Sequence, residues 1–249
     1  MAHNAESLNF NERLENYSSK LITFFHKIIN LKIRYIEIKA IQMSDIVWFL
    51  AKEDFKFLSS LSQIKNKQFI PLYYPWKKIK SSISLKKDNK SLLILGSMDW
   101  YPNYIGTLNF VKNIFPKLLE INSDYSLVIV GKKPNNEIKN LNHKNIVVTG
   151  FVDSINSYIK KADLLIVPNR LGSGVKIKVM EAISNGLPVV MFKENVSGYP
   201  IQLFNFPFVV SSDEEFVKAI IFLNNNFLLK DKFLKRANSY FNDLRSLKF

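Results

Sequence analysis

The sequence predicts an α/β fold in which helices cover both faces of a parallel sheet. From residue 91 onward, short apolar runs alternate with segments of helical periodicity. The runs are rich in Val, Ile and Leu, as is typical of strands buried on both faces. Several runs end in glycine, where the chain would turn into the next helix. Alternation of this kind favours a parallel sheet.

The predicted elements of this region follow one another in a regular order. Strands are expected at SLLILGS, YSLVIVG, NIVVTGF, DLLIVPN, LPVVMF and FPFVVSS. Helices are expected over 106–120, 154–161, 175–185, 213–224 and 228–244. Ligands bind outside the carboxyl ends of the strands in such sheets, so the loops after the strands carry the candidate site.

The first third of the chain has a different organisation. An amphipathic helix is expected over 5–30 and a helix end at 40–44, followed by a strand in IVWFLA, a helix over 53–61 and a strand end in QFIPLYYP. Residues 77–90 are charged and weakly periodic, and we interpret them as a linker. The predicted domains are therefore 1–76, which is helix-rich, and 91–249. Trp48 and Trp76 are expected to pack in the core and at the hinge.

The composition excludes several kinds of site. The chain has 249 residues and no cysteine, which rules out disulfides and thiolate metal sites and suits a cytoplasmic protein. Its three histidines lack the spacing of metal ligands, so no metal is expected. No charge-free apolar run is long enough to cross a membrane, and the polar N-terminus argues against a secretory signal.

The formal net charge of +14 favours an anionic partner. A field of this sign attracts nucleic acid, anionic lipid or a phosphate-bearing substrate. The lysines are spread along the chain, so a simple bias toward Lys and Asn explains the number equally well. No aromatic RNA-binding platform is present, which disfavours nucleic acid.

The segment GSGVKIKVMEAISNGLPVV has the residues of a phosphate-binding turn. Gly172 and Gly174 precede the helix predicted over 175–185, where unpaired N–H groups and the helix dipole favour phosphate. Lys176 and Lys178 add positive charge, and Glu181 could accept hydrogen bonds from a ribose diol. A tight strand-to-helix turn with surface lysines is the alternative.

Five segments in order resemble the C-terminal domain of family 4 glycosyltransferases. They are LLILGSMDWYPN, IVGKKP, VTGFV, YIKKADLLIVPNRLGSGVKIKVMEAISNGLPVV and DEEFVKAI. The exopolysaccharide-type sugar transferases, with G-S-M-D-W-x-P-N and G-S-G-x-x-x-K-x-x-E-A, are the most similar subset. The resemblance implies the C-terminal Rossmann-like half of a GT-B fold, preceded by a remnant of the N-terminal Rossmann domain.

The resemblance also implies a role for each candidate residue. It places the donor, a UDP- or GDP-sugar, in the C-terminal domain without a metal or other cofactor. Ser173 and Glu181 would be the catalytic positions, with Glu181 also holding the donor ribose. The donor-binding residues would be Gly96, Ser97, Asn103, Gly131, Lys132, Gly150, Phe151, Val152, Arg170, Gly172, Gly174, Lys176, Lys178 and Glu181.

Three departures from the family pattern bear on activity. Ser173 stands where the first glutamate of the family motif is usual, and Ser97 stands where many members have an arginine that faces the diphosphate. Lys176, Lys178 and Arg170 are the candidates to replace that arginine, or else they are solvated surface charges. Only about 90 residues precede the C-terminal domain, so the acceptor domain is incomplete.

Three functions therefore remain open at this point. The first is a retaining glycosyltransferase of hexosyltransferase type in polysaccharide biosynthesis, with a glycan or lipid-linked acceptor and a separate chain to complete the acceptor domain. It would work in the cytoplasm or at the inner membrane face. The second is a non-catalytic nucleotide-sugar-binding fragment, and the third is a basic protein that binds nucleic acid or an anionic membrane surface.

Overall fold

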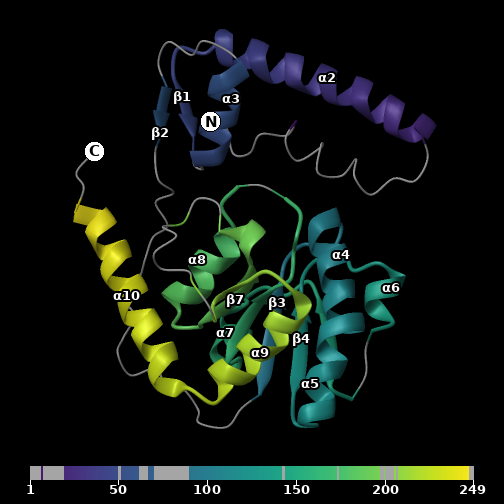
Figure 1. The fold of residues 1–249 in the computed structure, drawn as a ribbon, viewed down its shortest axis with the longest axis vertical. Helices are drawn as coiled ribbons and strands as arrows, with labels where there is room; N and C mark the ends of the chain where they lie inside the picture. The colour runs from purple at the N-terminus through teal and green to yellow at the C-terminus, as the bar shows by residue number, and fades with distance from the viewer. Residues whose placement is uncertain are drawn as a thin grey trace. The chain divides into compact units, whose positions relative to one another are not determined.

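The computed structural model describes residues 7, 20–49, 52–61, 67–69, 90–141, 144–172, 174–196, 199, 205 and 207–246. The chain forms two compact units (Figure 1). The helical unit comprises Met1–Leu72, Leu171–Val175 and Ser197–Tyr199, and the sheet unit comprises Tyr73–Arg170, Lys176–Val196 and Pro200–Phe249. The predicted linker lies outside the described residues except for Lys90.

Within the described residues, the sheet unit contains a six-stranded sheet in the order β5-β4-β3-β6-β7-β8. All its neighbouring strands are parallel. The strands are β3 (Ser91–Leu95), β4 (Ser126–Val130), β5 (Ile146–Gly150), β6 (Leu164–Val167), β7 (Val189–Phe192) and β8 (Val209–Val210). Each lies within one of the six predicted apolar runs, and the predicted α/β class is confirmed.

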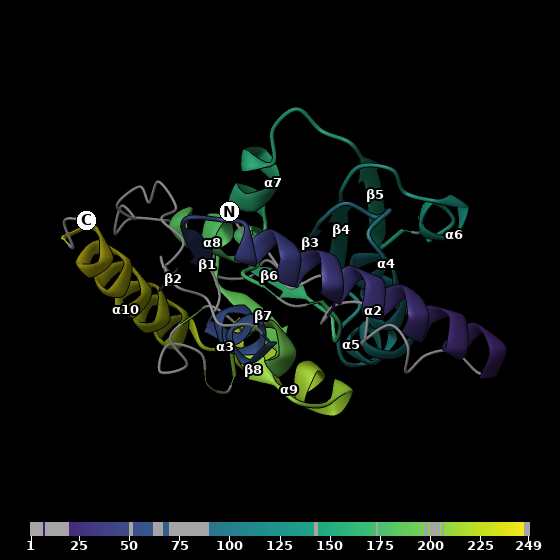
Figure 2. The same cartoon turned by 90° about the horizontal axis from the view of Figure 1, so that it is seen from above.

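Helices cover both faces of this sheet (Figure 2). On one side lie α4 (Tyr101–Asn109), α5 (Phe115–Ile121) and α9 (Asp213–Asn224), and on the other lie α7 (Asn156–Lys161) and α8 (Ile177–Ser184). The last helix, α10 (Phe227–Ser246), contacts both α8 and α9. Two short elements, α6 (Asn136–Lys139) and η2 (Lys193–Asn195), were not predicted.

The helix predicted over 106–120 begins earlier and is not uniform. It starts at Tyr101, since Pro102 in the first turn needs no hydrogen-bond acceptor for a backbone N–H. Between α4 and α5 runs the π-helical segment η1 (Phe110–Ile114). Pro116 follows directly and has no N–H to donate to the preceding turn, so the wider π turn lies where the regular α-helical pattern is interrupted.

An aromatic cluster joins one helical face to the sheet. Phe216 of α9 packs edge-on against Phe192 of β7 and Phe110 of η1, with ring centroids 4.8 Å and 5.7 Å away. All three side chains are fully buried. Buried aromatic pairs of this geometry contribute beyond the area they bury, so the cluster fixes α9 and η1 against β7.

The helical unit is built around a small core. It contains α2 (Lys20–Gln42), β1 (Val47–Phe49), α3 (Lys52–Leu61) and β2 (Lys67–Phe69), and the two strands are parallel. Its core consists of Ile41, Val47, Phe49 and Leu58. The predicted helix therefore runs on to Gln42, while residues 8–19 lie outside the described part of the chain.

The prediction that Trp48 packs in the core is wrong. Its side chain is 43% exposed, whereas Val47 and Phe49 on either side are buried. Successive side chains of a strand point to opposite faces, so burying Val47 and Phe49 turns Trp48 outward. Trp76 lies outside the described residues. No helix in the described part of the chain has the length and apolar character that a membrane span requires.

Candidate donor-binding site

The order of the strands predicts where a ligand would bind at one edge of the sheet unit. The central strand β3 has β4 on one side and β6 on the other, and the chain builds outward from it in both directions. Connecting helices therefore leave to opposite faces at this point, and ligands of such sheets bind outside the carboxyl ends of the strands, here β3 and β6. The candidate residues of the sheet unit lie after β3, β4, β5 and β6 and in the helices α4 and α8.

The loops after β3 and β4 touch through their backbones. The N–H of Gly96 donates to the carbonyl of Val130 at 3.1 Å, and the N–H of Met98 donates to the carbonyl of Lys132 at 3.0 Å. A Cβ atom on Gly131 would overlap the carbonyl oxygen of Gly96. Glycine at position 131 is thus required by close approach, which explains one of the strand-end glycines.

Asn103 connects three segments near the switch point, which is the place between β3 and β6 where the strand order reverses. Its Nδ2 donates to the carbonyl of Ser97 at 3.0 Å, in the loop after β3. Its Oδ1 accepts one hydrogen bond from Asn169 Nδ2, after β6, and one from Lys178 Nζ, in the first turn of α8, both at 2.9 Å. The side chain is 6% exposed. The buried amide therefore fixes two strand ends and one helix relative to each other.

These contacts bring the N-termini of α4 and α8 together. Asn103 and Lys178 are first-turn residues of the two helices, and Nζ of Lys176 lies 5.7 Å from the ring centroid of Trp100. Trp100 and Lys176 are the N-cap residues, and neither makes a side-chain capping hydrogen bond. Two partly positive helix ends thus meet beside two lysines, an arrangement that suits an anion.

The electrostatic environment of Lys178 is unusual for a lysine. Its burial, and then the positive charge of Lys176, lower the pKa of Lys178 to about 7. Lys176 is itself 6% exposed. At neutral pH the ammonium and amine forms of Lys178 are therefore both populated, and an anion nearby would favour the ammonium form.

Glu181 lies one turn further along α8 and is half-buried. Burial raises the pKa of this carboxyl group above its usual range. No described side chain forms an ion pair with it. A carboxylate in this position is able to accept hydrogen bonds from hydroxyl groups of a ligand.

The two glycines before α8 both have a left-handed backbone conformation. Gly172 has φ of 95° and Gly174 has φ of 81°, both in the left-handed region that glycine adopts without steric cost. Ser173 between them lies outside the described residues. Its predicted catalytic position thus stays a prediction.

The candidate residues after β4 and β5 are more open. Gly150 ends β5 with φ of 73° and its carbonyl accepts a hydrogen bond from Gly131 at 3.1 Å. Phe151 is 71% exposed, Val152 is half-buried, and Lys132 is exposed. These residues lie at the neighbouring strand ends of the same sheet edge, where a planar ligand group could lie along the backbone.

Asp99 in the loop after β3 is occupied by local contacts. It accepts a hydrogen bond from the Ser97 hydroxyl and forms an ion pair with Lys133 at 3.0 Å. The hydrogen bond from Ser97, followed by the interaction with Lys133, lowers the pKa of Asp99. The Ser97 hydroxyl therefore stabilises the loop after β3 through its hydrogen bond to Asp99.

The guanidinium of Arg170 is engaged by other groups. Its guanidinium lies 3.7 Å from the ring centroid of Phe192, donates to the carbonyl of Ser211 at 3.1 Å and pairs with Asp213 at 3.0 Å. These contacts dock the N-terminus of α9 onto the end of β6. A role for Arg170 toward a diphosphate would require these bonds to break.

Two asparagines at the site were missed by the sequence analysis. Asn169 follows β6 and Asn195 follows β7, and they are 1% and 0% exposed. Asn195 Nδ2 donates to the carbonyls of Asn169 and Phe192. The signal available for Asn169 was a polar residue at the end of the apolar run DLLIVPN, whereas Asn195 is the last residue of η2. Among the described residues, no cluster of three or more acidic or histidine side chains could hold a metal ion.

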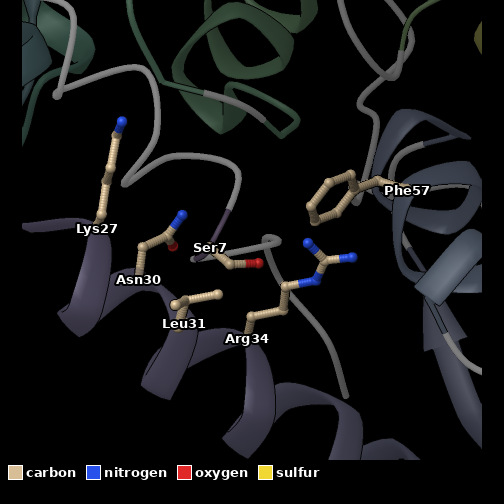
Figure 3. A pocket seen from close by; sticks show the side chains of 6 residues that line it. All are labelled: Ser7, Lys27, Asn30, Leu31, Arg34 and Phe57. Atoms are coloured by element: carbon tan, nitrogen blue, oxygen red, sulfur yellow. The ribbon is translucent and has the colours of Figure 1, made fainter.

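The helical unit has a separate pocket of about 290 Å³ (Figure 3). Residues of α2 and α3 and the buried Ser7 line it: Ser7, Lys27, Asn30, Leu31, Arg34 and Phe57. Arg34 extends toward Phe57, and the Ser7 hydroxyl donates to the Glu37 carboxylate. No residue here was predicted as part of a site.

Comparisons with solved structures give the fold of a GT-B glycosyltransferase. TarM from S. aureus, solved as a mutant with fondaparinux, alpha-GlcNAc-glycerol and UDP, matches with a TM-score of 0.70 and 14% identity over 87% of this chain and 44% of its own. HepE from Anabaena, in complex with UDP and glucose, matches with a TM-score of 0.66 and 14% identity over 85% of this chain and 62% of its own. The pneumococcal O-GlcNAc transferase GtfA, in complex with UDP and GlcNAc, matches with a TM-score of 0.55 and 13% identity over 85% of this chain and 47% of its own.

The chain thus spans 43–62% of the length of TarM and HepE, two of the solved structures that it resembles. No curated protein matches it by sequence. The family profile described as "Glycosyl transferases group 1" matches residues 89–226, which is more than half of the chain and includes the loops that follow β3, β4, β5 and β6. The chain therefore belongs to the group 1 glycosyltransferases.

Proposed function

We propose that the sheet unit binds a nucleotide-diphosphate sugar and that the protein transfers the sugar to a glycan or lipid-linked acceptor with retention of configuration. Membership of the group 1 glycosyltransferases supports sugar transfer. The observation that carries the donor site is the meeting of the α4 and α8 N-termini at the switch point, with Lys176 and Lys178 beside them. Structurally similar proteins were solved with UDP.

In the proposed complex, the diphosphate faces the two helix N-termini and the lysine pair. Backbone N–H groups and ammonium groups would offset the charge that develops on the leaving nucleotide diphosphate. This arrangement supplies without a metal the electrostatic stabilisation that transfer requires. Glu181 accepts the ribose hydroxyls, and the strand end at 150–152 lies beside the base.

The sugar would lie near the loop 172–174. Because Ser173 cannot act as a carboxylate, a general base would have to come from elsewhere, and the leaving diphosphate is the group nearest the reacting carbon. We propose that the diphosphate takes the proton of the attacking hydroxyl on the same face of the sugar, which retains configuration.

The acceptor would be held by polypeptide beyond the sheet unit. The helical unit contains one two-stranded sheet among its described residues, and the chain covers 43–65% of the length of the solved glycosyltransferases and synthases that it matches. Positioning both substrates requires two walls of a cleft. A related structure, GtfA/B, is a complex, so we propose that a separate chain completes the acceptor domain.

Donor binding can be tested by calorimetry on the full chain with UDP-glucose, UDP-GlcNAc and GDP-mannose. If Glu181 accepts the ribose hydroxyls, Glu181→Ala should weaken the preferred donor by about 1.5–3 kcal/mol, which is about 10- to 150-fold in Kd. The matched control is Glu120→Ala, which removes an exposed carboxylate of α5. Equal affinities of Glu181→Ala and the unchanged protein would contradict this role.

A turnover assay separates the enzyme from a non-catalytic binding fragment. Release of nucleotide diphosphate from the bound donor, with water or an added glycan as acceptor, is expected for the enzyme. The anomeric configuration of the product, read by NMR, tests retention. Saturable donor binding without turnover under any acceptor would favour the binding fragment.

A further inference from the structure

Lys178 is a half-buried cation whose hydrogen-bond partner is neutral. Its Nζ lies 2.9 Å from the amide oxygen of Asn103, and no carboxylate in the described part of the chain forms an ion pair with it. Buried lysines are usually compensated by a carboxylate, because burying an unpaired charge is costly. This site lacks that compensation at the place where an anionic ligand is proposed to bind.

The charged groups around Lys178 do not supply it either. On α8, Lys176 repels it, and Glu181 lies a turn away and does not pair with it. Asp99, after β3, is paired with its own lysine, and Arg170, after β6, is bound to α9. The first turn of α4 carries no acidic residue. A positive charge on Lys178 is therefore opposed by its surroundings until an anion arrives.

Asn103 is suited to hold Lys178 in either protonation state. Its Nδ2 donates to the Ser97 carbonyl, and its Oδ1 accepts from Asn169, so the amide orientation is fixed. The oxygen can accept a hydrogen bond from an ammonium or from a neutral amine. Loss of the proton therefore leaves the amine in the same place, ready for recharging.

We propose that Lys178 couples donor binding to proton uptake, with Asn103 as the residue that positions it. When the diphosphate binds, the neutral amine of Lys178 takes one proton from the buffer and becomes an ammonium group that pairs with the diphosphate. No other bond forms or breaks in this step. The inference rests on the proposed donor site and adds a dependence on pH to it.

The direction of the pH dependence follows from the two states. Burial and Lys176 lower the pKa of Lys178 to about 7 in the free protein, and a diphosphate would raise it. Below pH 7 the lysine is already charged, so the affinity is highest and independent of pH. As pH rises through 7, Kd should increase by up to about tenfold per pH unit until the pKa of the complex is reached.

Calorimetry of the full chain tests the proton uptake. The ligand is UDP-glucose or GDP-mannose, whichever binds more tightly. Their diphosphates are diesters that carry constant charge between about pH 6 and about pH 8.5. Titrations at about pH 7.5 in buffers of different ionisation enthalpy should show uptake of a large fraction of one proton. Kd measured across the same range should rise above pH 7.

Lys178→Arg separates charge from proton coupling. Arginine stays protonated, so this variant should bind the donor with no proton uptake and a flat pH profile, whatever its absolute affinity. Lys218→Met, which removes an exposed lysine of α9, is the control and should keep the uptake. Asn103→Asp should also abolish the uptake, because a carboxylate beside Lys178 keeps it charged before the donor binds.

The outcomes distinguish the two proposals. Donor binding by the unchanged protein without proton uptake, or undiminished uptake in Lys178→Arg, overturns the proton coupling and leaves the donor site intact. Absence of binding for every nucleotide sugar at all pH values overturns both. A pH-dependent Kd that Lys178→Arg abolishes supports both.

Discussion

At the residue scale, glycines set how closely the loops of the site can approach. Gly131 lies against the carbonyl of Gly96, and Gly150 occupies a left-handed backbone conformation with open space beside it. The two positions therefore need glycine for different reasons. The first is steric contact between backbones, and the second is the torsional preference of the chain.

Alanine substitutions at the two glycines should differ in cost. Gly131→Ala should lower the free energy of unfolding by about 3 kcal/mol, the upper end of the usual cost of overpacking, because the new methyl group meets backbone that cannot rotate away. Gly150→Ala should cost about 1–2 kcal/mol from its positive φ alone. Urea midpoints of both variants measure this, and a larger loss for Gly150→Ala would contradict the steric argument.

The sequence predicted some residues of the site but not the hydrogen bonds that connect them. Gly172 and Gly174 were predicted to form a turn before a helix, and both adopt a positive φ there. The contact between Asn103 and Asn169 spans 66 residues of sequence. No local pattern carries such a pairing, since it arises only when β3 and β6 become neighbours in the sheet. The assignment of a bound donor to these residues stays a prediction.

At the element scale, α9 shows how a helix start is fixed from several directions. The Ser212 hydroxyl accepts the Glu215 N–H at 3.1 Å, and the Glu215 carboxylate accepts the Ser211 N–H at 2.7 Å. Three acidic residues occupy its first turn, where their negative charges interact favourably with the helix dipole. Arg170 adds an ion pair with Asp213 from the end of β6.

Removing this cap should destabilise the sheet unit by a modest amount. Ser212→Ala leaves the Glu215 N–H without its acceptor and should reduce the free energy of unfolding by about 1 kcal/mol. Ser212→Asp, which restores an acceptor, should recover most of that loss. Thermal or urea unfolding measures both variants, and equal stability of the alanine and unchanged proteins would show that the cap contributes nothing.

Elements with a strong periodic signal were predicted well, and short or irregular ones were not. The central strands β3, β6 and β7 are continuous apolar runs whose burial on both faces is visible in the sequence, whereas the edge strand β5 leaves Val147 50% exposed. The π-helical turn at Phe110–Ile114 and the four-residue helix α6 have no such signal. The exposure of Trp48 was mispredicted because its size suggested burial, whereas strand alternation decided its direction.

At the scale of the whole molecule, the net charge of +14 should act on every anionic ligand. Affinity for the preferred nucleotide sugar should fall severalfold between about 0.05 M and about 0.5 M NaCl, because added salt shortens the range of the field. Retention of the protein on heparin, with and without nucleotide sugars, measures its binding to polyanions in general. Retention that nucleotide sugars do not reduce, together with no donor binding in calorimetry, would instead favour the general polyanion binder.

The central position of β3 also has a consequence for how the protein is made. This strand is the first of its sheet to leave the ribosome, yet one of its two neighbours is β6, and Asp163 accepts the Ser91 N–H across 72 residues. Until β6 is synthesised, the backbone N–H and C=O groups along one edge of the apolar strand β3 have no native partner and are open to mispairing. Pairing over such sequence distances also slows folding. Slower translation at reduced growth temperature should therefore increase the yield of native chains over inclusion bodies.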